Sequence, residues 1–473
     1  MITPKFSIII PAYNNAEFLG DSIRSCLNQT FPGFEVIVVN DASPDNTEEV
    51  IRSFDDHRIK YLVHKKNKGL SAARNTGIKA SIGEYIALLD GDDIFHPKKL
   101  EIHYEFLEQH PEIGVTYNPR FELNHSSMTI RDLWFPPSTV TLVDLVFGFP
   151  FSPSDMVIRR DWAFKVNLFD ERYTYVGEDL DINCRLGLVG CKFVSVDKTL
   201  NYRRYHSNRI IKDLQATVDS TMRPLIELFQ NPGCPVDILK LKEKAFASHL
   251  LLWSVIAFLQ GDTALGREYC LSAVSKDPSI LVGNPSKLID TLIYYSIVDD
   301  SKPHEQILQR IIDQLPSEFV VPHSQYKWAV ARGYFLRGLR AIIWGRIQDG
   351  NEHLTRAIEL GAQIDQPLFT RITAQLLNFE AEFGPDATRD VIKNLSVHLI
   401  RIGGRSLLRR LYGSFLINQA FRSYKVGNYP NTVNTVIKAA AEDPKFLSNR
   451  GVLSILFRSI IRAATQPTTS AIL

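Results

Sequence analysis

The segment LDGDD, residues 89–93, gathers three carboxylates, Asp90, Asp92 and Asp93, directly after a run of apolar residues. Carboxylates this close repel one another unless a positive group lies among them. Asp90 and Asp92 could share a divalent cation with a phosphorylated ligand, and hard oxygen donors select Mg²⁺ or Mn²⁺ for such a site. Two other interpretations remain open. The segment could be a solvated turn, or a calcium loop, although the spacing and the distal Glu of an EF-hand are missing.

Further polar segments of the same half of the chain could complete a nucleotide-diphosphate site. PAYNN begins at Pro11 and offers Tyr13 for stacking on a flat base, and NDASPDNT offers Asp41 as a hydrogen-bond acceptor for a base edge. KNKGLSAARNTG places Asn67 and Arg74 at a loop-to-helix junction, which suits an anion or a base. A stacking ring, an acceptor, a cation and a carboxylate pair together describe a pocket for a nucleotide diphosphate.

Strands are predicted before these segments. Short β-branched runs predict buried strands at 6–10, 34–40, 59–63 and 85–89. Amphipathic stretches between them predict helices at 16–29, 47–54 and 70–80. This alternation is typical of an α/β fold with a mostly parallel sheet, whose strands have their carboxyl ends at one edge. The polar segments are therefore expected to meet there.

The order of these motifs resembles that of family 2 glycosyltransferases, which have the GT-A fold. FSIIIPAYNN, VIVVNDASPDNT, NKGLSAARNTGI, YIALLDGDD and GEDLDINCRLGLVG follow one another as in that family over residues 5 to about 210. The resemblance implies that Tyr13 and Asp41 hold the base of a nucleotide sugar, usually a uridine, and that Arg74 supports the nucleotide. It also implies that Asp90 lies near the ribose and that Asp92 carries the metal. The predicted donor-binding set is Pro11, Tyr13, Asp41, Asn67, Arg74 and Asp90, and the predicted metal ligands are Asp92, Asp90 and His206.

Glu178 and Asp179 open a predicted helix, where acidic side chains also act as ordinary helix caps. By the family resemblance Asp179 is the general base that removes the proton of an acceptor hydroxyl, and Glu178 helps to position the acceptor. A metal-bound diphosphate is a good leaving group that needs no acid, so the sugar carbon should invert its configuration. His206, in LNYRRYHSN, resembles the family's histidine that completes the metal or diphosphate site; the alternative is an exposed or structural role.

Helical periodicity replaces strand-like alternation from about Leu214, which predicts a GT-A glycosyltransferase domain at 1–213 and an α-helical domain at 214–473. Gly261 and Gly427 are each followed by alanine at offset 12 and proline at offset 17, and Gly345 repeats the alanine. This spacing resembles degenerate tetratricopeptide repeats, and an irregular helical bundle is the alternative. The helical domain is expected to bind a protein partner or a second copy of the chain.

Composition limits the classes of partner and the cellular locations that the sequence allows. The chain has 473 residues, 45% hydrophobic and 22% charged, with a net charge of +2, so nothing in it predicts nucleic-acid binding. The five cysteines form no CxxC pair, and no apolar run reaches the length of a membrane span. We therefore expect a cytoplasmic protein without a transmembrane segment. The basic stretch 401–425, which lacks acidic residues, is compatible with peripheral contact at the inner face of a membrane.

These observations predict an inverting, hexosyltransferase-type enzyme. Its expected donor is a nucleotide-diphosphate sugar carried by UDP, its acceptor a hydroxyl of a glycan, a lipid-linked or a protein substrate, and its cofactor Mg²⁺ or Mn²⁺. Dinucleotide oxidoreductases and sugar nucleotidyltransferases are disfavoured because PAYNN lacks the glycine-rich loop that both would need. The alternative is a non-catalytic scaffold, a decayed transferase domain joined to protein-binding helical repeats. Retention of Asp41, Asp90, Asp92, Glu178 and Asp179 argues against decay.

Overall fold

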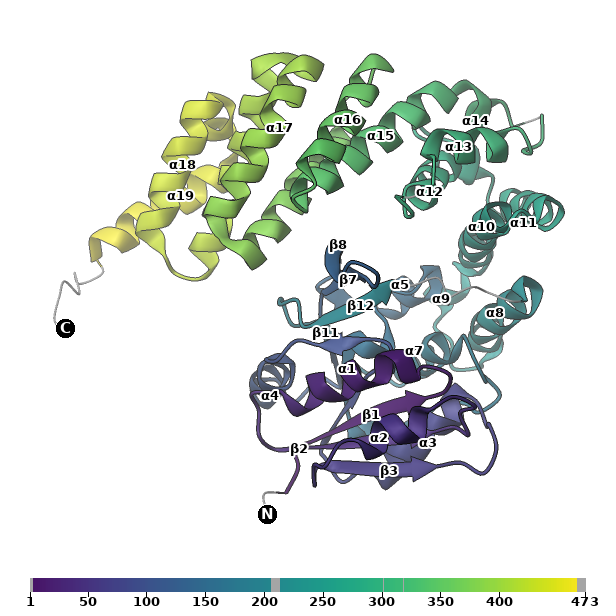
Figure 1. Ribbon diagram of the computed structural model, residues 1–473. Helices are drawn as coiled ribbons and strands as arrows, with labels where there is room; N and C mark the ends of the chain where they lie inside the picture. Colours follow the sequence, from purple (N-terminus) through teal and green to yellow (C-terminus); the bar gives the residue numbers. More distant parts are fainter. Residues whose placement is uncertain (1–2, 206–212, 301, 318, 466–473) are drawn as a thin grey trace. The chain divides into compact units, whose positions relative to one another are not determined.

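The computed structural model describes residues 3–205, 213–300, 302–317 and 319–465. The chain divides into two compact units, residues 1–291 with 313–322 and residues 292–312 with 323–473. The first unit contains both β-sheets, and the described part of the second unit is helical (Figure 1).

The main sheet is mixed and largely parallel. Its strands are β1 (Phe6–Ala12), β2 (Phe34–Asn40), β3 (Ile59–Val63), β4 (Tyr85–Leu88), β6 (Val115–Tyr117), β9 (Thr139–Val140), β10 (Met156–Arg159) and β11 (Phe193–Ser195). Their order is β3-β2-β1-β4-β10-β6-β11-β9, with the first four parallel and β10 antiparallel to both neighbours. The smaller sheet has the order β5-β12-β7-β8 and consists of β5 (Ile94–Phe95), β7 (Arg120–Asn124), β8 (Thr129–Trp134) and β12 (Asn201–Tyr205).

Helices surround the main sheet and then continue to the end of the described chain. The first eleven are α1 (Ala16–Leu27), α2 (Thr47–Arg52), α3 (Leu70–Ala80), α4 (Lys99–Gln109), α5 (Leu142–Phe147), α6 (Arg160–Lys165), α7 (Glu178–Leu188), α8 (Leu214–Gln230), α9 (Val236–Leu239), α10 (Lys242–Gln260) and α11 (Thr263–Lys276). The remaining ones are α12 (Lys287–Ser296), α13 (His304–Ile312), α14 (Val320–Ser324), α15 (Tyr326–Ile343), α16 (Ile347–Glu359), α17 (Gln366–Lys425), α18 (Tyr429–Glu442) and α19 (Arg450–Thr465).

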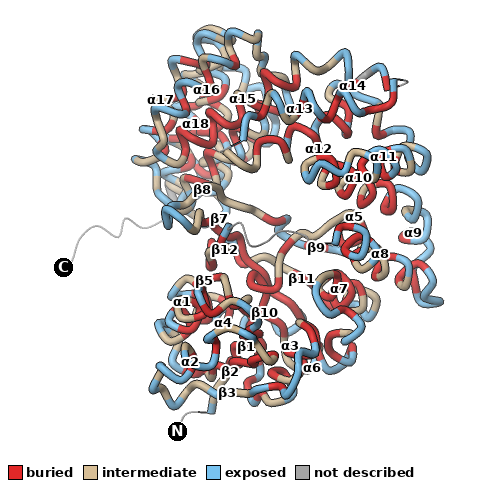
Figure 2. The backbone as a smooth tube through the Cα atoms, turned by 45° about the vertical axis from the view of Figure 1, so that its right-hand side comes forward, coloured by how far each residue is buried: buried red, intermediate tan, exposed pale blue. Residues whose placement is uncertain are grey.

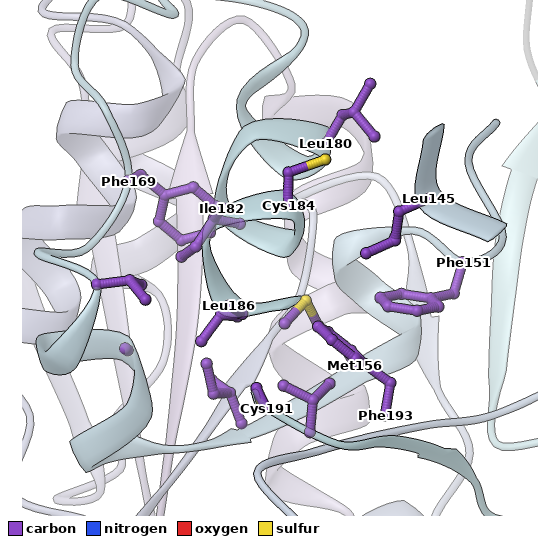
Figure 3. Close-up of a cluster of buried hydrophobic side chains, with 14 of the residues drawn as sticks. Leu145, Phe151, Met156, Phe169, Leu180, Ile182, Cys184, Leu186, Cys191 and Phe193 are labelled. Carbon is purple, nitrogen blue, oxygen red and sulfur yellow. The ribbon is translucent and has the colours of Figure 1, made fainter. Parts of the chain in front are cut away.

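Two hydrophobic cores lie on the two faces of the main sheet, because successive side chains of a strand point to opposite faces. Ile8 and Ile10 pack with residues of α1, α2 and α4, whereas Ile9 packs with residues of α3, α6, α7 and α8. The central strands are buried and red in Figure 2. Figure 3 shows part of the second core, into which α7 inserts Leu180 and Leu186. The sheet and α7 are thereby held as one body.

The predicted fold class, a mostly parallel mixed sheet flanked by helices and followed by a helical region, is confirmed. The predicted strands and helices of the first 89 residues are also confirmed, with ends that differ by up to two residues. The burial predicted for strand 59–63 is wrong. β3 lies at the edge of the sheet, and its residues are half-buried or exposed.

The predicted domain boundary coincides with a change of architecture but not with the edge of a compact unit. α8 begins at Leu214, yet the unit that contains the sheets continues to Thr291. Leu225, Leu228 and Phe229 of α8 belong to the core on one face of the sheet. The division into domains 1–213 and 214–473 therefore stays a prediction, and the sheet draws part of its hydrophobic cover from beyond residue 213.

The repeated glycines lie where one helix turns into the next. Gly261 joins α10 to α11, Gly345 joins α15 to α16, and Gly427 joins α17 to α18. Their φ angles are +91°, +77° and +75°, in the left-handed region that favours glycine. The alanine twelve residues after each glycine is fully buried. The pattern thus marks helical hairpins, while the likeness to tetratricopeptide repeats stays a prediction.

The basic stretch 401–425 forms part of α17, which is interrupted at Gly403 and Gly404. Leu411, Phe415 and Leu416 of this stretch are buried in the helical unit. These three residues therefore serve packing within the helical unit. No helix among the described residues is both long enough and apolar enough to cross a membrane.

Candidate active site

The ends of four parallel strands bring the sequence motifs together at one edge of the main sheet. Tyr13 follows β1, Asp41 follows β2 and His64 follows β3, while Asp90 comes two residues after the end of β4. Because these neighbouring strands are parallel, their carboxyl ends point the same way. The predicted meeting of the motifs at this edge is confirmed.

Asp41 holds the loop that leads into α3. Its Oδ1 accepts hydrogen bonds from His64 Nδ1 at 2.6 Å and from the backbone N–H of Lys68 at 2.8 Å, and its Oδ2 accepts the N–H of Gly69 at 2.8 Å. The carboxylate is buried. A carboxylate oxygen has two lone pairs, so Oδ2 can accept one more bond. The predicted contact of Asp41 with a base edge is thus restricted to this second oxygen and stays a proposal.

The PAYNN segment contributes one exposed ring and one close contact. Tyr13 is 49% exposed, as a stacking residue must be, whereas Pro11 is buried within β1. A Cβ on Gly91 would lie 3.2 Å from the carbonyl oxygen of Pro11 and 2.1 Å from Nδ2 of Asn15. A larger residue between Asp90 and Asp92 would therefore displace the Asn15 side chain and crowd the carbonyl of Pro11, which shows how closely the PAYNN segment packs against the carboxylate motif.

Arg74 of α3 is the positive group among the carboxylates. It is buried, and it donates one hydrogen bond to Asp90 Oδ1 at 2.7 Å and another to Glu178 Oε1 at 2.6 Å. Burial by itself lowers the pKa of Arg74. The two neighbouring carboxylates outweigh this effect and raise the pKa above its ordinary value. The sequence predicted a nucleotide contact for Arg74, and the structure shows a bridge between two acidic motifs. Asn67 is exposed, and its Oδ1 accepts the N–H of Gly69 at 3.1 Å.

The two acidic residues at the start of α7 differ in environment. Glu178 is buried beside Arg74, and burial raises its pKa to about 7 although Arg74 opposes the rise. Asp179 is half-buried, and its Oδ1 accepts the N–H of Leu180 at 2.8 Å. Burial raises the pKa of Asp179, opposed by this hydrogen bond and by Arg74, while the charge of Asp90 adds to the rise. A raised pKa makes a carboxylate a stronger proton acceptor.

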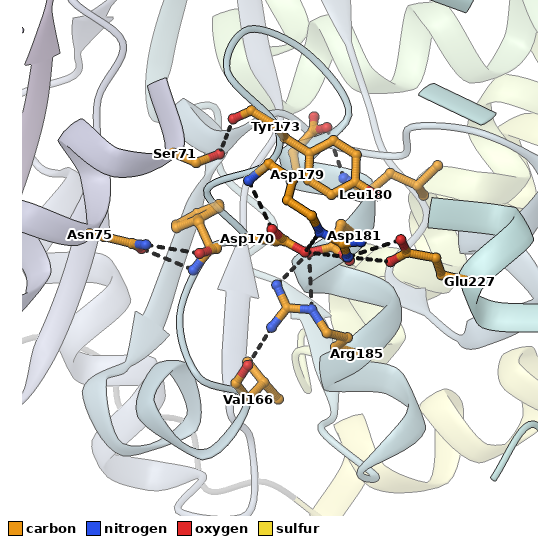
Figure 4. A network of polar contacts seen from close by, with 12 residues as sticks. Ser71, Asn75, Val166, Asp170, Tyr173, Asp179, Leu180, Asp181, Arg185 and Glu227 are labelled. Carbon is orange, nitrogen blue, oxygen red and sulfur yellow. Dashed lines mark hydrogen bonds and ion pairs between the residues drawn. The ribbon is translucent and has the colours of Figure 1, made fainter. Parts of the chain in front are cut away.

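A set of polar contacts fixes the segment that leads into α7 (Figure 4). Ser71 Oγ of α3 donates to the carbonyl of Tyr173 at 2.5 Å, and Asn75 Nδ2 donates to the carbonyl of Phe169 at 2.8 Å. At the other side of α7, Arg185 pairs with Asp181 and donates to the carbonyl of Val166. α3 thus positions both Arg74 and the loop that delivers Glu178.

A buried polar network lies behind Asp90. The backbone N–H of Asp90 donates to Ser154 Oγ at 3.1 Å. The neighbouring Asp155 is fully buried and accepts from Arg120 at 2.6 Å and from Asn201 Nδ2 at 2.9 Å. Such satisfied buried networks hold a unique geometry. The carboxylate motif is therefore anchored from behind as well as by Arg74.

The carboxylate motif has the oxygen chemistry of a magnesium or manganese site. Asp90 is 29% exposed at its side chain, and Asp92 is half-buried. Among the described residues no group of three or more His, Cys, Asp or Glu side chains could hold a metal ion. Two carboxylates nevertheless fit an ion that takes its other ligands from diphosphate and water. The third predicted ligand, His206, lies outside the described residues.

Sequence reasoning missed His64 and Ser154. His64 bonds Asp41 through Nδ1 and Thr76 Oγ1 through Nε2, the latter at 2.9 Å, so it ties the end of β3 to α3. Its position directly after a predicted strand was the available signal. No sequence pattern pointed to Ser154, because Ser154 and Asp90 are 64 positions apart in the sequence and meet only in the folded structure.

Aromatic residues are frequent between the carboxylate motif and α7, in WFPP at 134–137 and FGFPF at 147–151. Phe151 is buried and stacks on Tyr117 with ring centroids 4.4 Å apart. Phe149 lies edge-on to His249 of α10 at 5.7 Å. Trp134 donates its indole N–H to the carbonyl of Pro150 at 3.1 Å. These aromatic residues are therefore used for packing.

Comparison with known sequences assigns these motifs to one family. Residues 7–162 match Glycosyl transferase family 2. A relative named UDP-Glc:alpha-D-GlcNAc-diphosphoundecaprenol beta-1,3-glucosyltransferase WfgD, from Escherichia coli, is 30% identical over 217 residues, which are 45% of this chain and 83% of that protein. An uncharacterized glycosyltransferase of Rickettsia bellii is 51% identical over 106 residues, covering 22% of this chain but only 15% of the relative.

Two solved structures show weaker likeness. TarS 1-349 from S. aureus has a TM-score of 0.45 and 18% identity, covering 68% of this chain and 90% of that one. The mannosyltransferase PcManGT from Pyrobaculum calidifontis, in complex with GDP-Man and Mn²⁺, has a TM-score of 0.44 and 14% identity, covering 69% and 88%. The sequence match over most of the length of WfgD is the decisive comparison. This chain therefore belongs to glycosyl transferase family 2.

Proposed function

We propose that the protein transfers a sugar from a UDP-linked donor to an acceptor hydroxyl, with inversion at the sugar carbon. The bridge from Arg74 to Asp90 and Glu178 is the observation that carries the proposal. It joins the strand-end carboxylates to the first turn of α7, so that a donor site and a base belong to one rigid arrangement. Rigid positioning of reacting groups is a main source of enzymatic rate.

Asp179 is the proposed general base. It is half-buried, and its raised pKa brings it closer to the pH at which it must accept a proton from the acceptor hydroxyl. Glu178 is bound by Arg74 and therefore acts by holding the start of α7, next to the proposed base. The role proposed for Glu178 is thus to position the start of α7, where the sequence predicted that it helps to position the acceptor.

The donor is proposed to lie along the strand ends. Tyr13 offers an exposed ring to the base. Asp41 and Asn67 both accept the backbone N–H of Gly69, in the loop before α3. Asp90 and Asp92 would hold Mg²⁺ or Mn²⁺, with His206 as a further proposed ligand. When bound, the ion stabilises the negative charge that develops on the leaving diphosphate. Arg74 stays beside Asp90 and limits the repulsion between the carboxylates.

The relative WfgD guides the choice of substrates. Its name specifies a UDP-Glc donor and an acceptor attached to diphosphoundecaprenol. We therefore propose UDP-glucose as the first donor to test and a lipid-linked sugar as the first acceptor, ahead of free glycans and proteins. The scaffold alternative is not favoured, because the carboxylates that catalysis would need are present in the first unit and two of them, Asp90 and Glu178, are held by Arg74.

The test combines thermal stabilisation by UDP with turnover of UDP-sugars. Wild-type protein should be stabilised by UDP more strongly when Mn²⁺ or Mg²⁺ is present, and it should hydrolyse one of the UDP-sugars slowly. Asp92→Ala should bind UDP without any effect of the metal, whereas Asp161→Asn, on the exposed face of α6, should behave as wild type. If no UDP-sugar is turned over and UDP does not stabilise the wild type, the proposal is wrong.

A further inference from the structure

Helix α19 has an exposed apolar face. Phe457, Ile460 and Ile461 are 61%, 47% and 65% exposed, and their spacing of three and four residues places them on one side of the helix. The opposite side, with Val452 and Ile455, belongs to a hydrophobic cluster shared with α17 and α18. Single exposed apolar side chains are normal on proteins, but three on one helical face mark an interaction surface.

The charge around this face is of one sign. From Pro444 to Thr465 the sequence has four basic residues, Lys445, Arg450, Arg458 and Arg462, and no Asp or Glu. Arg450 and Arg458 are exposed. The guanidinium of Arg462 donates to the hydroxyl of Tyr429 at 2.6 Å and is also exposed. The three arginines lie on the same helix as the apolar face.

We propose that the apolar face of α19 docks the protein onto the surface of an anionic membrane. In this arrangement Phe457, Ile460 and Ile461 insert between the headgroups and the acyl chains, and the arginines bind lipid phosphates. A second copy of the protein is a poorer occupant, because face-to-face pairing would set the arginines of both chains against one another. The proposal does not depend on the proposed reaction, although it would bring the enzyme to a lipid-linked acceptor.

The experiment is sedimentation of the full-length protein with lipid vesicles, without any sugar substrate. Wild-type protein should bind vesicles of phosphatidylcholine mixed with phosphatidylglycerol, should bind phosphatidylcholine alone much more weakly, and should be released by high salt. A triple variant, Phe457→Ser with Ile460→Ser and Ile461→Ser, should bind at least about 10-fold more weakly. Arg450→Gln with Arg458→Gln should lower binding on the order of 10-fold while leaving the apolar face intact.

The matched control replaces three apolar residues of the first unit, Ile82, Val236 and Val282, by serine. They are 63%, 68% and 70% exposed and thus at least as exposed as the three residues of α19. This control should bind vesicles like the wild type, and circular dichroism should show unchanged helix content in all variants. Binding that persists in the α19 triple variant, or no binding by the wild type, overturns the proposal. Equal binding to neutral vesicles also overturns it. A dimer seen by light scattering, and lost in the α19 triple variant, overturns it in favour of self-association.

Discussion

At the scale of single residues, Arg74 supplies the positive charge that the carboxylates of this site need. It is buried, and both of its hydrogen-bonded partners, Asp90 and Glu178, are acidic. A buried ion pair adds little stability compared with an apolar replacement of the whole pair, but removal of one partner leaves an uncompensated charge. The residue is therefore a strong determinant of both stability and site geometry.

At pH 8, where Glu178 is ionised, replacement of Arg74 by methionine should lower the free energy of unfolding by about 3 to 5 kcal/mol, because the buried carboxylate would lose its partner. Adding Glu178→Gln should restore part of this loss. The exposed Arg172, which pairs with Asp170 and Glu227, provides the control. Its replacement by methionine should cost about 1 kcal/mol or less. Urea unfolding measures all three variants, and equal losses for the two arginines would contradict this account.

Glu178 should also make stability depend on pH. The folded protein holds its proton up to about pH 7, whereas the ordinary pKa of the carboxyl is 4.5. Between these values the folded state binds more protons than the unfolded chain, so the free energy of unfolding falls as pH rises. The fall attributable to this residue is on the order of 3 kcal/mol. It should appear as a declining difference between wild type and Glu178→Gln in unfolding experiments; a constant difference would refute it.

Asp179→Asn should lower kcat by about 10²- to 10⁴-fold, the usual contribution of a general base. The affinity for UDP should stay unchanged, since the substitution keeps the size of the side chain and leaves Arg74 with both of its partners. Steady-state kinetics and calorimetry with UDP measure the two quantities. Nearly normal turnover would remove Asp179 from the role of base.

At the scale of elements, the start of α7 depends on a glycine. Gly177 has φ of +93°, and a Cβ there would lie 2.7 Å from the carbonyl oxygen of Ser220 in α8. Ser220 in turn donates its hydroxyl to the carbonyl of Val176 at 2.7 Å. α8 thus contacts the backbone immediately before Glu178 and Asp179, although it lies beyond the predicted transferase domain.

Gly177→Ala should therefore combine backbone strain with a steric clash. We expect a loss of about 2 to 3 kcal/mol in the free energy of unfolding, and lower kcat because the start of α7 must shift. Gly190→Ala is a suitable control, since its φ is +80° but nothing lies within 4 Å of the added Cβ. It should cost about 1 to 2 kcal/mol and leave kcat unchanged. Thermal unfolding and kinetics of both variants decide the matter, and a normal kcat in Gly177→Ala would count against the clash.

At the scale of the whole molecule, the first compact unit reaches beyond the predicted transferase domain. A fragment of residues 1–213 loses Leu225, Leu228 and Phe229 of α8, and with them part of the core on one face of the sheet. This fragment should aggregate or bind a hydrophobic dye, whereas residues 1–322 should unfold cooperatively. Leu225→Ala in the full chain should cost about 2 to 5 kcal/mol. Cooperative unfolding of 1–213 at the same temperature as 1–322 would contradict this prediction.

Much of the fold could be predicted because local patterns and global packing agree. Strands such as β1 and β2 consist of apolar β-branched residues, and the helices between them have clear amphipathic patterns. The candidate site could be located because polar residues directly follow parallel strands. The edge position of β3 was not predictable, because its order in the sheet depends on strand pairing between distant segments.

By itself, the sequence determined which residues could do chemistry and that the ends of the strands would bring them together. Motif order and strand periodicity can be read directly from the sequence. They suffice to predict the family and to predict that Asp90 follows a strand and that Asp179 begins a helix. Only the tertiary structure decided which side chains these residues contact. The contact of Arg74 with Glu178 spans 104 positions, and that of Asp90 with Ser154 spans 64. Such pairs form because packing of α3, α7 and the sheet places charged and polar groups together in a buried region, where each group requires a partner.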